Sequence, residues 1–89
     1  MATSIIRHKV KDYAAWRGLF DSFESTRKEN GEQSYQVLQA DGDPNDVIVI
    51  NTWLSVDDAN AFLAKDELKT AMADAGVIGP LDVTIANET

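Results

Sequence analysis

Four stretches of the chain alternate between apolar and polar residues, and this period of two is typical of β-strands. The pattern predicts strands over residues 3–10, 32–40, 47–54 and 81–86. In the first strand the alternation divides the side chains between two faces, with Ile6, His8 and Val10 on one and Ile5, Arg7 and Lys9 on the other.

Between the first two strands, apolar residues recur at helical spacing instead. Asp12 is placed to cap the start of this helix, and Asn30-Gly31 supplies a left-handed end. One stripe of the helix carries most of the aromatic residues of the chain: Tyr13, Trp16, Phe20 and Phe23, together with Leu19.

A second helical region follows the third strand. Ser55 and Asp58 resemble a capping box with Asp in place of Glu. The helix continues or begins again near Asp66 and ends at Gly76. Its inward positions are predicted to be Ala59, Phe62, Leu63, Leu68, Met72 and Ala75.

Turn-forming residues separate these elements. The segment DGDPND, residues 41–46, is expected to be a six-residue loop joining two strands of a hairpin, and Gly79-Pro80 is expected to turn the chain into the last strand. If Ala40 faces Val47 in this hairpin, then Gln36 faces Asn51 on the same side of the sheet.

The resulting order, β-α-β-β-α-β, predicts an α+β domain of the ferredoxin-like class, with a four-stranded antiparallel sheet and both helical regions on one face. The third strand is apolar on both sides at residues 47–50, and the first carries Ile5 and Ile6 on opposite faces. The uncovered face would then expose a large apolar patch. A homodimer that packs sheet on sheet would bury this patch; the alternative is a monomer with a partly apolar surface.

Composition narrows the classes of partner. A chain of 89 residues holds one domain, residues 1–89, and its net charge of −7 repels nucleic acids and anionic membrane surfaces. The first ten residues contain neither the apolar core of a signal peptide nor a membrane span. With no cysteine there is no thiolate metal site or disulfide, and a cytoplasmic location is expected.

Four segments together resemble the dimeric α/β-barrel superfamily, and within it small proteins related to antibiotic-biosynthesis monooxygenases. These segments are VKDYAAWRGLFDSF, DGDPNDVIVINTW, LSVDDANAFLAKDELKTAM and AGVIGP. The resemblance implies dimers whose two sheets close into a barrel, with a pocket between the sheet and the helices of each subunit. Chemistry in the superfamily ranges from cofactor-free oxygenation of phenols to haem degradation and isomerisation. Met72 stands where haem-degrading relatives carry a histidine ligand, so neither haem nor another cofactor is expected.

Three residues are candidates for catalysis. His8 is the one side chain whose ordinary pKa lies near neutrality, which suits a general base that removes a phenolic or enolic proton. The resemblance implies that Asn51 and Trp53 help to line the pocket. Each has a structural alternative. His8 would then be a solvated or hydrogen-bonded strand residue, Asn51 a strand amide with its hydrogen bonds satisfied, and Trp53 an aromatic anchor of the core.

The candidate substrate-binding residues are Gln36, from the hairpin register, and Trp16, Phe20 and Arg27, from the helical stripe. Arg27 is unexpected on an apolar stripe unless it reaches an anion or extends its guanidinium to solvent at the helix end; the second interpretation is favoured. The Asp41, Asp43 and Asp46 cluster lacks the spacing of a calcium loop, and no metal site is expected.

Three functions are consistent with these patterns. The first is a cofactor-independent monooxygenase of small aromatic or polyketide-like compounds. The alternative is a non-catalytic dimer that binds a small molecule or serves as an accessory subunit, and a weaker alternative is a cyclase or isomerase of the same superfamily. The expected partners are a second copy of the chain and a small aromatic ligand.

Overall fold

The computed structural model describes all residues, 1–89, of the chain. Its elements follow in the order β1 (Ala2–Val10), α1 (Tyr13–Ser22), α2 (Glu24–Glu29), β2 (Glu32–Ala40), β3 (Asp43–Trp53), α3 (Val56–Leu63), α4 (Asp66–Asp74) and β4 (Val77–Asn87).

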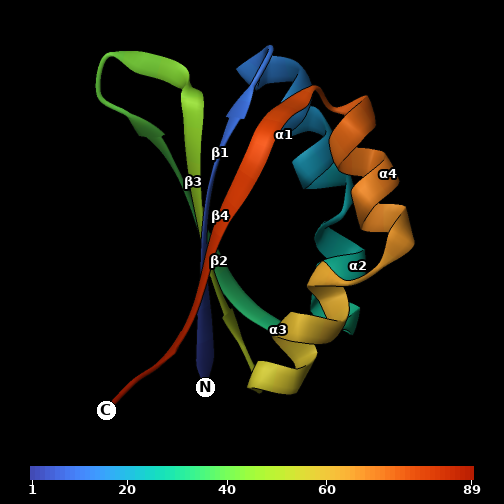
Figure 1. The fold of residues 1–89 in the computed structure, drawn as a ribbon. Coiled ribbons are helices and arrows are strands. Elements are labelled where there is room, and N and C mark those ends of the chain that lie inside the picture. The colour runs from blue at the N-terminus through green and yellow to red at the C-terminus, as the bar shows by residue number, and fades with distance from the viewer.

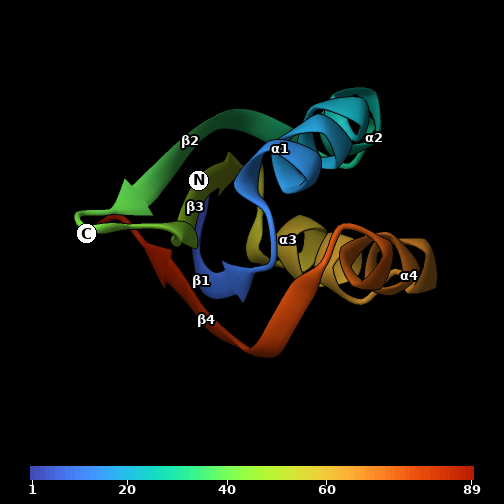
Figure 2. The same ribbon diagram turned by 90° about the horizontal axis from the view of Figure 1, so that it is seen from above.

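The four strands form one antiparallel sheet in the order β2-β3-β1-β4. All helices lie on one face of this sheet, as α1–α2 and α3–α4 pairs placed side by side (Figures 1 and 2). The predicted α+β, ferredoxin-like fold is confirmed. No helix is both long enough and apolar enough to cross a bilayer.

The first helical region is one helix in the prediction but two in the structure. Asp12 caps α1 as expected, accepting a hydrogen bond from the backbone N–H of Ala14 at 3.1 Å. The break comes at Phe23, beside Ser22, whose hydroxyl donates to the carbonyl of Leu19 at 2.6 Å. Such a side-chain bond competes with the helical ladder and permits a short second helix to begin at a new angle.

The hairpin loop is shorter than predicted. β3 begins at Asp43, so Asp41 and Gly42 alone join it to β2, with Gly42 at a φ of 84°. A shift in the pairing between Gln39 and Ala40 accommodates the remaining residues within the strand. Sequence composition marked these residues as turn formers, but a β-bulge also accepts them.

The predicted register of this hairpin is wrong by one residue. Asn51 pairs with Tyr35, and Gln36 pairs instead with Ile50. Because side chains alternate between the faces of a sheet, the shift moves Gln36 to the face that the helices do not cover, where it is exposed. Gln36 is therefore not a pocket residue. Tyr35 occupies the position opposite Asn51 that was predicted for Gln36.

The last strand is longer than predicted, because Gly79-Pro80 lies within β4 and does not form a turn before it. The pairing with β1 shifts between Arg7 and Lys9, which leaves extra residues of β4 as a bulge. Gly79 adopts a φ of 74°, and Pro80 needs no hydrogen-bond partner for its nitrogen on this edge strand.

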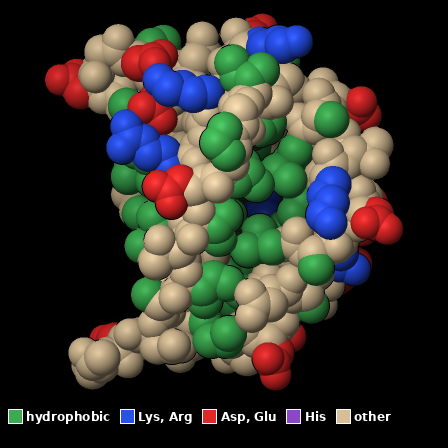
Figure 3. Space-filling model, in the orientation of Figure 1, with side chains coloured by type: hydrophobic (Ala, Val, Ile, Leu, Met, Phe, Trp, Pro, Cys, Tyr) green, Lys and Arg blue, Asp and Glu red, His purple; other side chains and the backbone are tan.

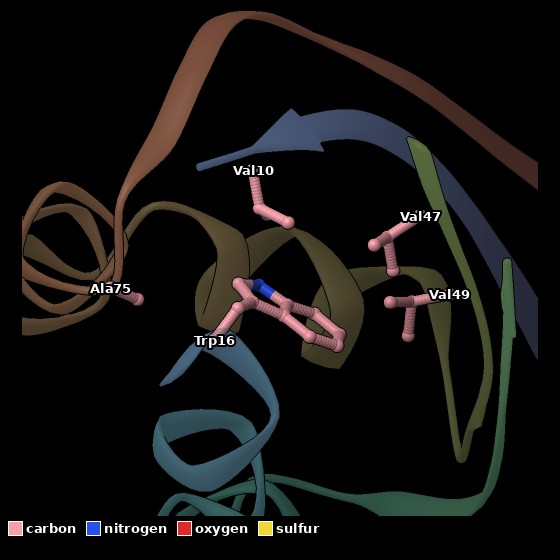
Figure 4. Close-up of a cluster of buried hydrophobic side chains, with 5 residues drawn as sticks. All are labelled: Val10, Trp16, Val47, Val49 and Ala75. Carbon is pink, nitrogen blue, oxygen red and sulfur yellow. The ribbon is translucent and has the colours of Figure 1, made fainter. Parts of the chain in front are cut away.

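The core lies between the sheet and the helices. Trp16 extends from α1 and packs against Val10, Val47, Val49 and Ala75, all of them buried (Figure 4). A second cluster joins Trp53 of β3 to Ala59 and Phe62 of α3. Burying each large side chain contributes roughly 1.5–3 kcal/mol. These clusters hold the two helix pairs at a fixed distance from the sheet.

The opposite face of the sheet is bare. Its exposed or half-exposed side chains include Ile5, Leu38, Ile48 and Ile50 near the centre, where β1, β2 and β3 are adjacent. Charged residues lie beside them, with Arg7 paired to Asp46 at 2.7 Å. The sequence prediction that this face carries an apolar patch is confirmed.

Candidate functional site

A cavity lies between the sheet and the helices. Fourteen of its 17 lining residues are apolar, and they come from the sheet and from both helix pairs. The cavity volume is about 80 Å³, and the hollow with its open mouth contains about 660 Å³ of space that atoms do not fill. Figure 3 shows the mouth between β4 and α4, surrounded by apolar side chains. An apolar hollow of this size, with few polar groups, is typical of a small-molecule site.

Only three polar side chains line this cavity: His8, Arg27 and Asn51. His8 and Asn51 come from the central strands β1 and β3, and Arg27 comes from α2. All three are buried. Side-chain hydrogen bonds to a molecule bound in the cavity would therefore come from very few groups.

His8 is 6% exposed, and neither of its ring nitrogens has a hydrogen-bond partner. Its ring lies 5.4 Å from that of Trp16, between centroids. Burial lowers the pKa of His8 below its ordinary value, and the negative charge of Asp46 opposes this shift only in part. The imidazole is consequently neutral at pH 7, with one nitrogen able to accept a proton.

Arg27 does not extend to solvent, so the favoured interpretation of its place on the helical stripe is wrong. Its side chain is 3% exposed, and its Nε donates to Oε2 of Glu32 at 2.9 Å. Nη1 donates to the carbonyl of Phe20, whose ring lies 3.8 Å below the guanidinium carbon. An ion pair and stacking on an aromatic face together compensate for the lost hydration of the guanidinium.

Glu32 connects Arg27 to a chain of buried hydrogen bonds. Asn51 donates from Nδ2 to the same Oε2 of Glu32 at 2.7 Å. Ser4 donates from Oγ to Oδ1 of Asn51 at 3.2 Å and accepts from Nε1 of Trp53 at 2.9 Å. These buried hydrogen bonds hold Asn51 and Trp53 in one arrangement in the wall of the cavity.

Most of the residues predicted from the sequence meet in this cavity. Trp16, Phe20 and Trp53 contribute apolar surface, while His8, Arg27 and Asn51 contribute the polar groups. Gln36 is the exception and lies on the other face of the sheet. The functional roles assigned to the remaining residues stay predictions.

Sequence reasoning missed Ser4 and Glu32. Ser4 lies on the same face of its strand as Ala2 and Ile6, so a small polar residue on the inward face of a strand was the available signal. Glu32 had no comparable signal, because its partner Arg27 lies across a helix end and only the fold brings the two side chains together. No three side chains of the metal-binding types gather anywhere in the chain.

Comparison with known proteins places this arrangement in a family. The profile of the antibiotic biosynthesis monooxygenase family matches residues 6–74, which include the second half of β1, both helix pairs and the hairpin. A search of curated proteins finds no match.

Solved structures share the fold at low sequence identity. SnoaB, a cofactor-independent oxygenase from Streptomyces nogalater, is 17% identical with a TM-score of 0.75, covering 99% of this chain and 94% of its own. A conserved protein from Methanosarcina mazei is 19% identical with a TM-score of 0.76, covering 100% and 94%. A Bordetella bronchiseptica protein of the same family description is 12% identical with a TM-score of 0.81, covering 99% and 96%. The matched profile spans most of the chain and the whole chain follows this fold, so the protein belongs to the antibiotic biosynthesis monooxygenase family.

Proposed function

We propose that this protein is a cofactor-independent oxygenase that acts on small, electron-rich aromatic compounds. The observation that carries the proposal is the neutral, unpaired imidazole of His8 in the wall of an otherwise apolar cavity. A base in such a place can take a proton from a hydroxyl group of a bound phenol or enol. Membership of the family and the fold shared with SnoaB are consistent with this chemistry.

An anthrone illustrates the reaction. His8 removes the proton of the enol form, and the resulting anion gives an electron to dioxygen. The two radicals combine in a new carbon–oxygen bond, after which a C–H bond and the O–O bond break. One oxygen atom stays in the product as a carbonyl, and the other leaves as water with the proton returned by His8. The substrate supplies all four electrons, so R₂CH₂ and O₂ give R₂C=O and H₂O.

The cavity walls favour these steps. Apolar side chains stack on aromatic ligands and exclude water. Water would otherwise compete with the substrate for the hydrogen bond to the acceptor nitrogen of His8. A cavity of roughly 150 Å³ is known to hold benzene. The cavity, at about 80 Å³, is smaller, so an aromatic substrate would extend into the open mouth between β4 and α4.

Oxygen consumption tests the proposal. With a panel of anthrones and hydroquinones, the wild-type protein should take up oxygen with at least one compound. Replacement of the proposed base by His8→Ala should lower kcat by about 10²–10⁴, the usual contribution of general base catalysis. Thr70→Ala, an exposed change on α4, is the matched control and should leave kcat unchanged. An unaltered kcat in His8→Ala would remove the base from the mechanism.

A non-catalytic binding function is the second candidate. The observation that favours it is that no hydrogen bond orients the ring of His8, whereas a catalytic base is usually held by a third group. Under this alternative the same panel would give no oxygen uptake, and at least one compound would raise the Tm of the protein.

We propose further that the protein is a homodimer whose subunits pack through the bare faces of their sheets. The apolar residues Ile5, Leu38, Ile48 and Ile50 support this arrangement, because a lone subunit would leave them against water. The cavity lies on the other side of the sheet. Dimerisation would therefore support the strands that hold His8 and Asn51 without closing the mouth.

A further inference from the structure

The cavity contains a cation whose charge is already cancelled. Arg27 is paired with Glu32 through Nε and Oε2 at 2.9 Å, and both side chains are almost completely buried, at 3% and 1% exposure. His8, the other ionisable residue of the lining, has a lowered pKa and is neutral at pH 7. The polar groups of the cavity wall, with Glu32 behind them, thus sum to a net charge of zero.

One donor of this ion pair remains free. A guanidinium group has five N–H bonds, distributed over Nε, Nη1 and Nη2. Nε donates to Glu32 and Nη1 to the carbonyl of Phe20, but Nη2 is buried without any partner. An unpaired buried donor is uncommon in proteins. Because Arg27 lines the cavity, an acceptor atom of a ligand bound there would satisfy Nη2.

Stacking holds the guanidinium in place for such a contact. Its central carbon lies 3.8 Å from the centre of the Phe20 ring and 4.9 Å from that of Tyr35. Because three separate interactions fix the plane of the group, Nη2 has one direction in which to donate. The guanidinium group of Arg27 is therefore positioned to donate to one acceptor atom and cannot easily rotate towards another.

Resting on the proposed binding of an aromatic ligand, we propose that the Arg27–Glu32 pair determines specificity by selecting a neutral acceptor oxygen, such as a ketone carbonyl, over a carboxylate. The physical reason is charge balance. A carbonyl oxygen accepts the hydrogen bond from Nη2 and leaves the cavity neutral. A carboxylate would add a negative charge that no cation compensates, because Glu32 already neutralises Arg27. Arg27 is thus a hydrogen-bond donor in this site and not an anion receptor.

His8 completes the description of the ligand. Its neutral imidazole accepts a hydrogen bond from a hydroxyl group, so the ligand that satisfies both residues is a hydroxyaryl ketone. Proton transfer to His8 would then create an imidazolium and a phenolate together, and the net charge of the cavity would stay zero. A ligand that was already anionic would give the cavity a net negative charge before the proton transfer.

Three compounds of similar size separate the possibilities. We expect 4-hydroxyacetophenone, with a neutral carbonyl, to bind to the wild-type protein at pH 7 at least tenfold more tightly than 4-hydroxybenzoate, with a carboxylate. 4-Ethylphenol, with neither acceptor, should also bind at least several-fold more weakly than the ketone. Isothermal titration calorimetry measures all three, and this comparison needs no variant.

Glu32→Gln should reverse this preference by raising the affinity for the carboxylate. The amide oxygen can still accept from Arg27 and Asn51, but the charge of Arg27 is no longer cancelled, so 4-hydroxybenzoate should bind at least tenfold more tightly than it does to the wild type. In the double variant Arg27→Gln, Glu32→Gln the net charge returns to zero and this gain should disappear. Glu24→Gln, which alters a surface pair with Lys28, is the matched control and should leave the ratio unchanged. Circular dichroism verifies the fold of each variant.

The outcomes distinguish this inference from the proposed function. If the ketone and the carboxylate bind equally well to the wild type, or if a folded Glu32→Gln does not gain affinity for the carboxylate, the charge selection is wrong, while binding by the cavity still stands. If none of the three compounds binds, both the selectivity and the proposed use of the cavity for small phenols are wrong. Should Glu32→Gln fail to fold, the wild-type comparison alone decides.

Discussion

A histidine ring without hydrogen-bond partners in an apolar cavity is stable only in its neutral form. His8 meets this description, since both ring nitrogens are unpaired and burial lowers its pKa. Charging it would place a cation among aromatic and aliphatic side chains, near an Asp46 carboxylate that Arg7 already engages at 2.7 Å. The same property that makes His8 available as a base also makes it sensitive to acid.

This property predicts a pH dependence of stability. The folded pKa of His8 lies below the unfolded value of about 6.5, so the unfolded chain binds more protons between the two values. The contribution of His8 is therefore present in full above about pH 6.5, falls as the pH is lowered through this value and levels off below the folded pKa. The maximum slope is about 1.4 kcal/mol per pH unit.

Urea unfolding between about pH 5 and pH 7 measures this slope, with His8→Leu as the reference that lacks the titration. The wild type should lose more stability than His8→Leu as the pH falls through this range. The pKa of Asp46 is lowered by its hydrogen bond to Arg7, so the loss of that pair occurs at more acidic pH and is common to both proteins. Parallel slopes in the two proteins would contradict a neutral, buried His8.

At the scale of elements, the junction between α2 and β2 decides the position of the cavity wall. Gly31 connects Arg27 on the helix to Glu32 on the strand, and its φ is 102°, in the region that favours glycine. A Cβ atom at this position would lie 2.6 Å from Oδ2 of Asp58. The carbonyl of Gly31 also accepts the backbone N–H of Leu54 at 3.0 Å, which connects the junction to the end of β3.

Gly31→Ala is therefore expected to destabilise the protein by about 1–3 kcal/mol, through backbone strain and the close contact with Asp58. Gly18→Ala is a matched control of opposite sign, because Gly18 lies within α1 with no atom within 4 Å of an added Cβ. It should stabilise the protein by about 0.5–1 kcal/mol. Urea unfolding of both variants tests the pair, and a Gly31→Ala protein as stable as the wild type would show that the junction relaxes freely.

At the scale of the whole molecule, the two faces of the sheet have different surroundings. One carries the helices and the cavity, and the other is apolar near its centre and uncovered (Figure 2). A stable interface buries at least about 1,000 Å² in total, which a four-stranded face can supply when two copies meet. The proposed assembly and the proposed ligand binding would therefore use opposite sides of the same strands.

Light scattering tests this assembly. The wild-type protein should have twice the mass of the 9.8 kDa chain at micromolar concentration. Ile50→Lys places a charge in the middle of the bare face, beside Ile5, and should shift the protein to the monomer. Ala61→Lys, on the exposed side of α3, is the matched control and should remain dimeric. A single-chain mass for the wild type would mean that the apolar face is tolerated in water.

The alternation of residues along each strand is a local property, and it correctly predicted the fold class, the inward face of β1 with His8, and the apolar outer face. The same local patterns could not decide the register of β2 on β3, which moved Gln36 to the wrong face, or whether Gly79-Pro80 is a turn or a bulge. Both depend on hydrogen bonds with another strand.

The sequence by itself determined that a small α+β domain forms, because the period of the hydrophobic pattern decides which elements can bury a face. It also placed Trp16, Phe20 and Asn51 among the candidates that line the cavity. Only the tertiary structure decided that Arg27 is buried, since its partner Glu32 and its supporting rings Phe20 and Tyr35 come from different elements. The energy of a buried charge depends on neighbours that are distant in the chain, and no local pattern contains them.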